Sequence, residues 1–396
     1  MIDVLVIGIG EYVTGLSQEN IATSDKSLGV IALSLFDMRE RGMINSIRLA
    51  GRDSQRFKRI RKHFSSDMKD TYPRLDSSFI FYPKEGHSDS AYKEALTHLP
   101  KGSAVLIFTP DDTHFQIAKE ALIEGMNVLV AKPLVKTTQE HQELQEIAKE
   151  RGLLLMLEVH KRFDPIYADA VDQIRTFGDF SYMHSYMSQP KSQLDTFASW
   201  AGISSDISYY LNSHHIDLLC WALSDIAKPI SVIATASTGV ASQKLGREVE
   251  DTITLTVQWK NIKSGNLGTS VHTASWIAPP SDVHSQQRFF YMGHQGEINI
   301  DQAHRGYNIA TESQGFKSAN PLFMKYTPRH GEFAGQNGYG YISIETFIKS
   351  SLDLIRNPSL LNKFNAILPT IENTLNVTQI LEAGRKSLDE KKVIYL

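Results

Sequence analysis

The sequence is short of the features that mark several classes of protein. Among 396 residues there is a single cysteine, Cys220, so an internal disulfide and a cysteine-rich zinc site are both excluded. The 41 Lys and Arg nearly balance the 44 Asp and Glu, which argues against a nucleic-acid-binding protein, because such proteins carry a strongly basic face. No apolar run approaches the ~20 residues that a membrane span requires. We therefore expect a soluble globular protein that binds neither nucleic acid nor membrane.

The start of the chain and its length give two further expectations. The chain opens directly into an apolar run at residues 2–7, without the basic leader and apolar core of an export signal. We therefore expect a cytoplasmic protein. At roughly 100–200 residues per domain, a chain of this length predicts two domains, each large enough to bury its own core.

Short apolar runs alternate with longer helical stretches over the first 160 residues. We predict strands at residues 4–8, 46–51, 103–109, 126–131 and 153–159, and helices at residues 30–43, 114–124 and 138–151. This alternation is typical of a parallel sheet covered by helices. It predicts an α/β fold with an N-terminal doubly wound Rossmann domain over residues 1–160.

The pattern changes after residue 160. Asp164-Pro165 has the form of a helix start, and residues 253–259 alternate as a half-buried strand. Residues 289–291 and 297–300 flank a glycine-containing turn and predict a hairpin, and we expect helices at 343–356 and 370–388 before a last strand at 393–395. We predict a C-terminal α+β domain with a mostly antiparallel sheet over residues 161–396. It would bind substrate and form oligomers, and its last helices could pack back on the first domain.

A glycine-rich turn follows the first strand. Gly8, Gly10 and Gly15 lie in the string Gly-Ile-Gly-Glu-Tyr-Val-Thr-Gly. Glycines there allow a tight turn and let a pyrophosphate approach backbone N–H groups at a helix start. Val13 occupies the usual place of the third glycine. The turn predicts a dinucleotide site, and the alternative is a glycine turn that joins strand to helix without a ligand.

The end of the second strand bears on the choice of cofactor. NAD enzymes usually carry a carboxylate there that binds the adenosine ribose, whereas this chain has Gly51-Arg52-Asp53. Arg52 could pair with a 2′-phosphate, so we expect NADP(H) to be preferred, with NAD(H) possible. The alternative is that Asp53 contacts the ribose and Arg52 faces solvent.

Three more segments carry chemistry. Residues 108–114, with Thr109, Pro110 and His114, and the pair Lys132-Pro133 each follow a strand, at the edge where such sheets bind ligands. Proline favours an extended Lys132, which can hold the side chain toward the crevice.

On the predicted helix 210–221, Tyr210, His214 and Asp217 share one face. The neighbouring His214 and His215 point about 100° apart on a helix, so we expect no shared metal and predict no metal site.

The order of these motifs resembles the glucose–fructose oxidoreductase, inositol dehydrogenase and rhizopine-catabolism family over nearly the whole chain. Within that family, several longer strings resemble the D-galacturonate reductases: Gly10-Glu11-Tyr12, Phe36-Asp37-Met38-Arg39, His160-Lys161-Arg162 and residues 186–193, 206–217 and 333–336. The resemblance implies NADPH-dependent reduction of the open-chain aldehyde of D-galacturonate to L-galactonate.

The resemblance also implies catalytic roles. Lys132 matches the lysine beside the nicotinamide, with Ala131 in place of the glutamate that usually precedes it. His214 matches the histidine of an Asp-x-x-x-His motif, and Tyr210 stands at the aspartate position. Lys132 would stabilise the developing alkoxide, either His214 or Lys132 would supply the proton, and Tyr210 would orient the reacting group.

The candidate contacts follow from the motifs and the resemblance together. Those for the cofactor are Gly8, Gly10, Glu11, Tyr12, Gly15, Arg52, Thr109, Pro110, His114, Lys132 and Pro133. Those for the sugar-acid substrate are Lys132, Arg162, Tyr210 and His214. Arg162 is the first candidate for the carboxylate, because a guanidinium can bind it with two hydrogen bonds; Lys191 and Arg329 are weaker alternatives.

Two other interpretations stay open at this point. Another NAD(P)-dependent sugar or polyol dehydrogenase would share every motif and differ in its substrate pocket. A non-catalytic NAD(P)-binding regulator is the second, since a fold does not determine a function. The resemblance further implies a homo-dimer or homo-tetramer that packs through the sheet of the second domain.

Overall fold

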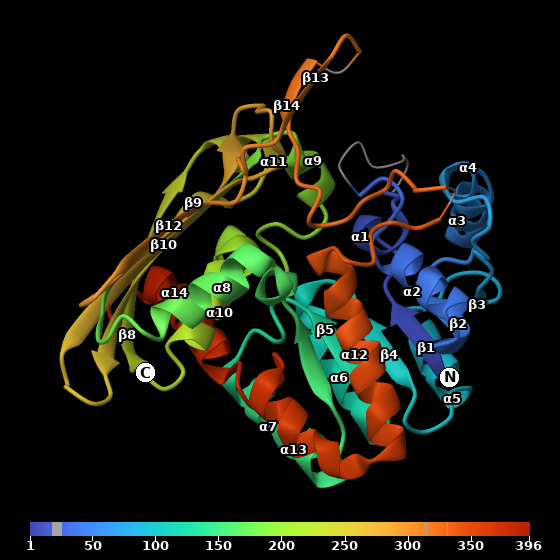
Figure 1. Ribbon diagram of the computed structural model, residues 1–396, viewed down its shortest axis with the longest axis horizontal. Helices are drawn as coiled ribbons and strands as arrows, with labels where there is room; N and C mark the ends of the chain where they lie inside the picture. The colour runs from blue at the N-terminus through green and yellow to red at the C-terminus, as the bar shows by residue number, and fades with distance from the viewer. Residues whose placement is uncertain (18–25, 314, 331) are drawn as a thin grey trace. The chain divides into compact units, whose positions relative to one another are not determined.

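The computed structural model describes residues 1–17, 26–313, 315–330 and 332–396, and Figure 1 shows its helices and strands. The chain forms two compact units. The first comprises Met1–Leu134, Gln139–Phe163 and Pro321–Asn373, and the second comprises Val135–Thr138, Asp164–Asn320 and Thr374–Leu396. The chain therefore passes repeatedly from one unit to the other, and neither unit is a continuous stretch of sequence.

The first unit is built on a six-stranded parallel sheet of strand order β3-β2-β1-β4-β5-β6. Its strands are β1 (Ile2–Ile7), β2 (Ile44–Ala50), β3 (Ile80–Tyr82), β4 (Ala104–Ile107), β5 (Asn127–Ala131) and β6 (Leu155–Glu158). This order is that of a doubly wound dinucleotide-binding fold, so the predicted fold class is confirmed. β3 is a strand that the sequence analysis misses.

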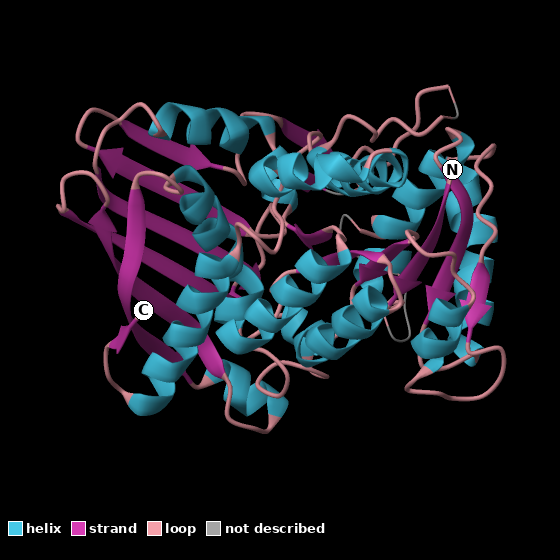
Figure 2. Cartoon of the chain, turned by 90° about the horizontal axis from the view of Figure 1, so that it is seen from below, coloured by secondary structure: helices cyan, strands magenta, loops and turns pink. Residues whose placement is uncertain are grey.

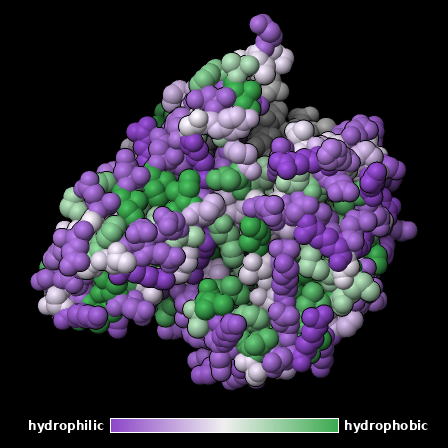
Figure 3. Space-filling view, in the orientation of Figure 1, coloured by the Kyte–Doolittle hydropathy of each residue, from purple (hydrophilic) through white to green (hydrophobic). Residues whose placement is uncertain are grey.

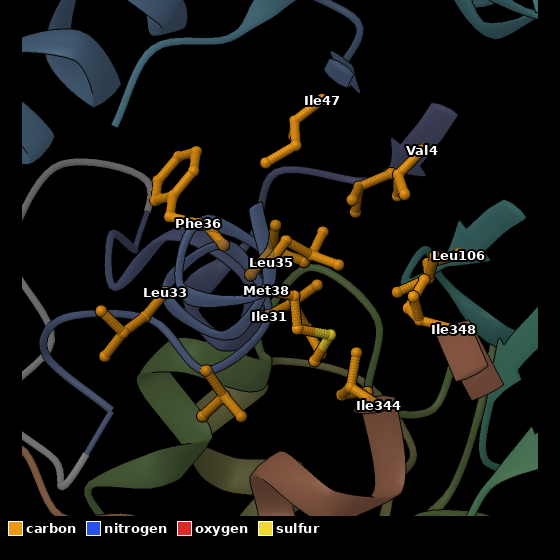
Figure 4. Close-up of a cluster of buried hydrophobic side chains, with 14 of the residues drawn as sticks. Val4, Ile31, Leu33, Leu35, Phe36, Met38, Ile47, Leu106, Ile344 and Ile348 are labelled. Carbon is orange, nitrogen blue, oxygen red and sulfur yellow. The ribbon is translucent and has the colours of Figure 1, made fainter. Parts of the chain in front are cut away.

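Helices complete the first unit and cover its hydrophobic core. They are α1 (Glu11–Thr14), α2 (Ile31–Glu40), α3 (Gln55–His63), α4 (Lys69–Thr71), α5 (Ala91–Thr97), α6 (His114–Ile123), α7 (Thr138–Arg151), α12 (Tyr339–Arg356) and α13 (Leu361–Ile367). Figure 4 shows Val4 of β1 and Met38 of α2 in the same buried cluster as Ile344 and Ile348 of α12. A helix from near the end of the chain thus completes the core that the first forty residues begin.

The first helix after β1 is short: α1 ends at Thr14, and α2 begins at Ile31. Gly15 ends α1 with φ 78°, and a Cβ on it would lie 2.1 Å from the carbonyl oxygen of Ser27. Only glycine fits such a position. Val30, just before α2, returns to donate its backbone N–H to the carbonyl oxygen of Tyr12 at 2.8 Å. The structure therefore requires glycine at position 15 for its backbone conformation and close packing, and its contact with the cofactor stays a prediction.

The second unit is built on a seven-stranded sheet of strand order β12-β11-β7-β10-β9-β8-β15. Only β7 and β10 pair in parallel within it, which confirms a mostly antiparallel sheet. The strands are β7 (Phe180–Pro190), β8 (Ala227–Thr238), β9 (Glu250–Asn261), β10 (Leu267–Ala278), β11 (Gln286–Gly293), β12 (Glu297–Asp301) and β15 (Ile394–Tyr395). A separate hairpin pairs β13 (Asn308–Thr311) with β14 (Gly315–Ser318).

Three helices of the second unit lie on one side of this sheet, as Figures 1 and 2 show: α8 (Pro165–Ile174), α10 (Ser213–Ala222) and α14 (Leu375–Glu390). Shorter helices are α9 (Gln193–Phe197) and α11 (Val240–Leu245). α8 begins as predicted, because the Asp164 carboxylate accepts the N–H of Ile166 at 3.1 Å. α14 begins later than predicted, because Thr370 instead forms a bridge with Met156 beside β6.

Across the described ranges, no helix is long and apolar enough to cross a lipid bilayer.

Candidate cofactor and substrate site

Gly8 and Gly10 have different parts in the turn after β1. Gly8 has φ 104°, and a Cβ on it would lie 2.1 Å from the carbonyl oxygen of Phe108, so only glycine fits. Gly10 is extended, and a Cβ on it would have no described atom within 4 Å. The backbone therefore faces open space where Glu11 and Tyr12 begin α1. Backbone N–H groups beside such an opening suit a pyrophosphate, so these residues fit a dinucleotide.

The loops after β4 and β5 are joined by a buried histidine. His114 has no exposed surface, and its Nδ1 and Nε2 lie 2.8 Å and 3.0 Å from the carbonyl oxygens of Pro133 and Thr109. Thr113 donates from its hydroxyl to that of Thr109 at 2.7 Å. His114 is predicted to contact the cofactor, but the structure instead makes it a support for the loops that carry Thr109, Pro110 and Pro133.

Lys132 follows β5 at the carboxyl edge of the sheet and is partly buried. Burial lowers the pKa of its ammonium group to about 7, although the charges of Asp111 and Glu158 raise the pKa, and Lys26 lowers it further. A lysine with a pKa near neutrality can both give and take a proton at neutral pH. The role of Lys132 in proton transfer stays a prediction, and its lowered pKa is the property that such a role requires.

Glu158 is a functional candidate that the sequence analysis misses. It ends β6, and its backbone pairs in register with Ala131, the residue before Lys132. Its carboxylate is buried and accepts a hydrogen bond from the Ser343 hydroxyl at 3.1 Å. The chain lacks the usual glutamate before Lys132, but it carries a carboxylate on the neighbouring strand that acts on the same ammonium group.

Two arginines follow β2. Arg52 is 76% exposed, and its guanidinium lies 3.7 Å from the equally exposed Asp89. Arg56, on the first turn of α3, is partly buried and donates to the carbonyl oxygen of Ile9 in the glycine-rich turn at 3.3 Å. Burial, and then the nearby Arg59, lower the pKa of Arg56. Both cations therefore lie near the end of β2. Arg56 could have been identified from the sequence, because it lies four residues after Arg52.

Arg162 lies at the other end of the same sheet edge, in the short helical turn His160–Phe163 after β6. Its side chain is buried at 7% exposure and donates to the amide oxygen of Asn373 at 3.4 Å. The strand order puts β6 next to β5, which leads to Lys132, and puts β1, β4 and β5 between it and the strand that leads to Arg52. Lys191 and Arg329, the weaker candidates, are both exposed.

In the second unit, Tyr210 and His214 lie on one helical segment. A π-helical turn, Ser208–Asn212, runs directly into α10. The prediction of a regular α-helix there is wrong for this first turn. Tyr210 is partly exposed, whereas His214 and Asp217 are buried. His215 lies 3.0 Å from the Tyr167 hydroxyl through its Nε2, which makes it a core histidine.

The start of this segment is fixed by a buried carboxylate. Asp206 accepts the backbone N–H groups of Ser208 and Tyr209 at 2.8 Å and 2.9 Å. Burial raises the pKa of Asp206 above its usual value, although the hydrogen bond from Tyr209 and the guanidinium of Arg385, 3.3 Å away, act in the opposite direction. Arg385 belongs to α14 and also pairs with Glu250 at 2.7 Å. The segment that presents Tyr210 is therefore tied to another helix of the same unit.

A metal site is not found in the part of the chain that the structure describes, where no three His, Cys, Asp or Glu side chains are grouped to hold an ion. Cys220 is buried in α10 and packs in the core of the second unit.

Comparisons with known proteins place this chain in a family. A family model described as "Oxidoreductase family, NAD-binding Rossmann fold" matches residues 2–159, and one described as "GFO/IDH/MocA C-terminal domain" matches residues 170–299. The chain therefore belongs to the GFO/IDH/MocA family of oxidoreductases, which confirms the predicted family. The class of protein that fold and family define is an NAD(P)-dependent oxidoreductase.

Particular relatives show what the chain is similar to. It is 25% identical to scyllo-inositol 2-dehydrogenase (NADP(+)) IolW of Bacillus subtilis over 316 residues, which cover 76% of this chain and 81% of the relative. It is 29% identical to UDP-N-acetylglucosamine 3-dehydrogenase of Acidithiobacillus ferrooxidans over 171 residues, 43% of this chain and 48% of the relative. The narrower resemblance to D-galacturonate reductases stays a prediction.

Solved structures share the fold. GenD2 from gentamicin A biosynthesis, in complex with NAD, superposes with a TM-score of 0.69 at 20% identity, covering 100% of this chain and 96% of that one. scyllo-Inositol dehydrogenase of Lactobacillus casei, with bound NAD(H) and scyllo-inositol, gives a TM-score of 0.66 at 16% identity, covering 100% and 98%.

Proposed function

We propose that this protein reduces the open-chain aldehyde of D-galacturonate to L-galactonate with NADPH. One observation carries the proposal: Lys132, whose pKa is about 7, and the buried cation Arg162 follow neighbouring strands at the ligand-binding edge of the Rossmann sheet. Reduction of a uronate needs a proton donor at its carbonyl oxygen and a cation for its carboxylate. These two residues supply both from adjacent positions in the fold.

The residues of the chain manage charge and protons in this proposal. When bound, NADPH supplies the hydride. The ammonium group of Lys132 stabilises the negative charge that develops on the carbonyl oxygen and can then give up its proton. For His214 and Tyr210, which lie on one helical segment of the second unit, the roles of alternative proton donor and of orienting group are those that the resemblance implies. Arg162 binds the carboxylate at the far end of the substrate.

The preference for NADP(H) rests on the end of β2. Arg52 and Arg56 offer two guanidinium groups for a 2′-phosphate, whereas the Asp53 carboxylate accepts the backbone N–H of Gln55 at 2.9 Å. That contact uses one oxygen of the carboxylate that would otherwise bind the ribose. Named relatives include both an NADP(+) and an NAD(+) scyllo-inositol 2-dehydrogenase, so NAD(H) stays a possible cofactor.

A second candidate is oxidation of a ring alcohol of a cyclic polyol to a ketone. The match to the NADP(+)-dependent scyllo-inositol 2-dehydrogenase, which spans 81% of that protein, favours this candidate. A non-catalytic NAD(P)-binding regulator is the alternative of a different class, and it would not need a lysine with a lowered pKa beside its cofactor.

A single screen separates these functions. NADPH oxidation is measured with uronates and neutral aldoses, and NADP⁺ reduction with inositols and L-galactonate. We expect D-galacturonate to give a kcat/KM at least ~10-fold above any neutral aldose, because only the uronate engages Arg162. Turnover of inositols without turnover of uronates would replace the first candidate by the second. NADPH binding without turnover of any compound would favour the regulator.

We further infer a homo-dimer or homo-tetramer formed through the outer face of the second sheet. Along β7, Met183 and Met187 are buried while Tyr182 and Tyr186, of the opposite face, are exposed. Met292 of β11, which pairs with Tyr182, is exposed on the same face, and Figure 3 shows apolar side chains among polar ones over this part of the molecule. Sedimentation of wild type and of Tyr186→Glu would test this: the variant should shift toward the monomer mass, and a monomeric wild type would refute the inference.

A further inference from the structure

An aromatic cluster lies beside Tyr210 in the second unit. The ring centroids of Phe197 and Trp200 are 5.0 Å and 5.3 Å from that of Tyr210. The ring of Trp276 lies 6.1 Å from Phe197 and 5.9 Å from Trp200. Phe197 and Trp276 are buried, whereas Trp200 and Tyr210 are partly exposed. The cluster thus has a buried base and two rings that keep accessible surface.

The backbone around Trp200 is tightly held. The carbonyl oxygen of Trp200 accepts the N–H groups of Ile203 and Ser204, both at 3.0 Å. The guanidinium of Arg247 donates to the carbonyl oxygens of Ala198 and Ala201 at 2.6 Å and 2.9 Å. These contacts hold the backbone on both sides of Trp200, and the rings of Phe197, Tyr210 and Trp276 pack against its indole. A side chain held in this way loses little conformational freedom when a ligand binds.

We propose that Trp200, together with Tyr210, is a platform on which the carbon–hydrogen face of a six-carbon polyhydroxylated ligand lies. This inference rests on the proposed function, in which the segment carrying Tyr210 and His214 contacts the substrate. The faces of aromatic rings carry partial negative charge, and the C–H hydrogens of sugars carry partial positive charge. A hexose-derived ring or chain presents several such hydrogens side by side, while its hydroxyl groups point elsewhere.

The proposed platform predicts that the effect of Trp200 depends on the size of the substrate. A three-carbon aldehyde such as glyceraldehyde is too short to lie across two neighbouring rings, so it should not depend on the indole of Trp200. A six-carbon ligand should depend on it. The shared chemistry, a run of C–H groups, can come from a cyclic source such as scyllo-inositol or a galactopyranuronate, or from an open-chain source such as L-galactonate.

The test combines binding and kinetics. Trp200→Leu removes the aromatic face, Trp200→Phe keeps part of it, and Trp221→Phe is the matched control, because Trp221 is a partly exposed tryptophan of α10 outside the cluster. Intrinsic fluorescence is titrated with scyllo-inositol, methyl D-galactopyranosiduronate and L-galactonate. We expect quenching in wild type and Trp221→Phe, loss of most of it in Trp200→Leu, and partial retention in Trp200→Phe.

Turnover provides the second measurement. With the six-carbon substrate that the screen identifies, Trp200→Leu should raise KM at least ~10-fold and change kcat less than ~3-fold, since the platform acts through binding. With glyceraldehyde the variant should match wild type. An unchanged KM and Kd in Trp200→Leu, with turnover intact, would overturn the platform and leave the proposed function standing. Ligand quenching that depends on Trp200, without turnover of any compound, would support the platform and refute the proposed reaction.

Discussion

Lys132 gives the molecule a pH dependence that can be worked out in sign. Its ammonium form dominates below the pKa of about 7 and is lost as the pH rises through that value. Reduction of an aldehyde consumes a proton and needs the ammonium form, so kcat/KM for reduction should fall above pH 7. Oxidation of the alcohol needs the neutral amine, so its kcat/KM should rise over the same range.

Two variants of Lys132 test this pH dependence. The arginine of Lys132→Arg stays charged over the whole pH range of the assay, so any residual activity should not show the fall in kcat/KM above pH 7. Lys132→Met should bind NADPH normally, melt no lower than wild type, and lose turnover. Stopped-flow assays and cofactor fluorescence would measure these properties. Turnover of Lys132→Met within ~10-fold of wild type would remove this lysine from the chemical step.

Glu158, on the neighbouring strand, should set the pH at which kcat/KM for reduction falls (the limb of the reduction profile). Its negative charge raises the pKa of Lys132, so Glu158→Gln should move the limb of the reduction profile below its wild-type position. The amide keeps the size of the side chain and an acceptor for Ser343. Ser343→Ala removes the hydrogen bond but keeps the charge, and it should shift the limb less. Equal shifts in both variants would mean that packing, and not charge, is responsible.

The two arginines after β2 should control cofactor choice. Replacing Arg52 and Arg56 by Gln removes two charge-assisted contacts to a 2′-phosphate, each worth about 1.5–3 kcal/mol. The double variant should lose ~100-fold or more in kcat/KM for NADPH and change less than ~3-fold for NADH. Wild-type enzyme that uses NADH as well as NADPH would contradict the assignment before any variant is made.

At the scale of elements, the turn that presents Tyr210 depends on its cap. Asp206→Ala leaves the N–H groups of Ser208 and Tyr209 without their carboxylate acceptor, which should cost about 1–2 kcal/mol of unfolding free energy. The melting temperature should fall by several degrees and substrate KM should rise. Asp206→Asn keeps an acceptor oxygen and should recover most of both losses. A variant of Asp389, the exposed partner of Arg385, should leave KM unchanged.

Elements with strong periodicity were predictable, and those set by distant partners were not. The alternating runs of β9 and the β11–β12 hairpin are visible in the sequence because each strand buries one face. Residues Ile80–Tyr82 are too few and too little buried to show alternation, so β3 emerges only from its pairing with β2. The start of α14 was misplaced because Thr370 is held by β6, a partner far away in the sequence.

The candidate site divides in the same way. Gly8, Gly10 and Lys132 stand in local strings next to strands, and such strings can be recognised without a structure. The role of His114 depends on the carbonyl oxygen of Pro133, which another strand brings within reach. The aromatic cluster joins Phe197 and Trp200, at and after the end of α9, to Trp276 of β10, and no local spacing indicates that they meet.

At the scale of the whole molecule, the first unit cannot be cut out as one continuous piece. Its buried cluster includes Tyr341, Ile344 and Phe347 of α12, so a fragment of residues 1–163 would expose their apolar partners. We expect that fragment to show no cooperative melting and no NADPH binding. Residues 1–163 joined by a short linker to residues 321–373 should recover both. Circular dichroism and cofactor fluorescence would decide, and a well-folded fragment 1–163 would contradict the expectation.

The interleaved path of the chain also bears on how the protein is made. A ribosome releases the N-terminus first, and domains that are continuous in sequence can fold one after another during synthesis. Here the first unit waits for Pro321–Asn373 and the second for Thr374–Leu396. All six strands of the nucleotide sheet are made by the time Glu158 is added, but the core beside that sheet stays incomplete until α12 has been made. Until those later segments are made, the apolar side chains that α12 and α14 cover stay exposed on the nascent chain.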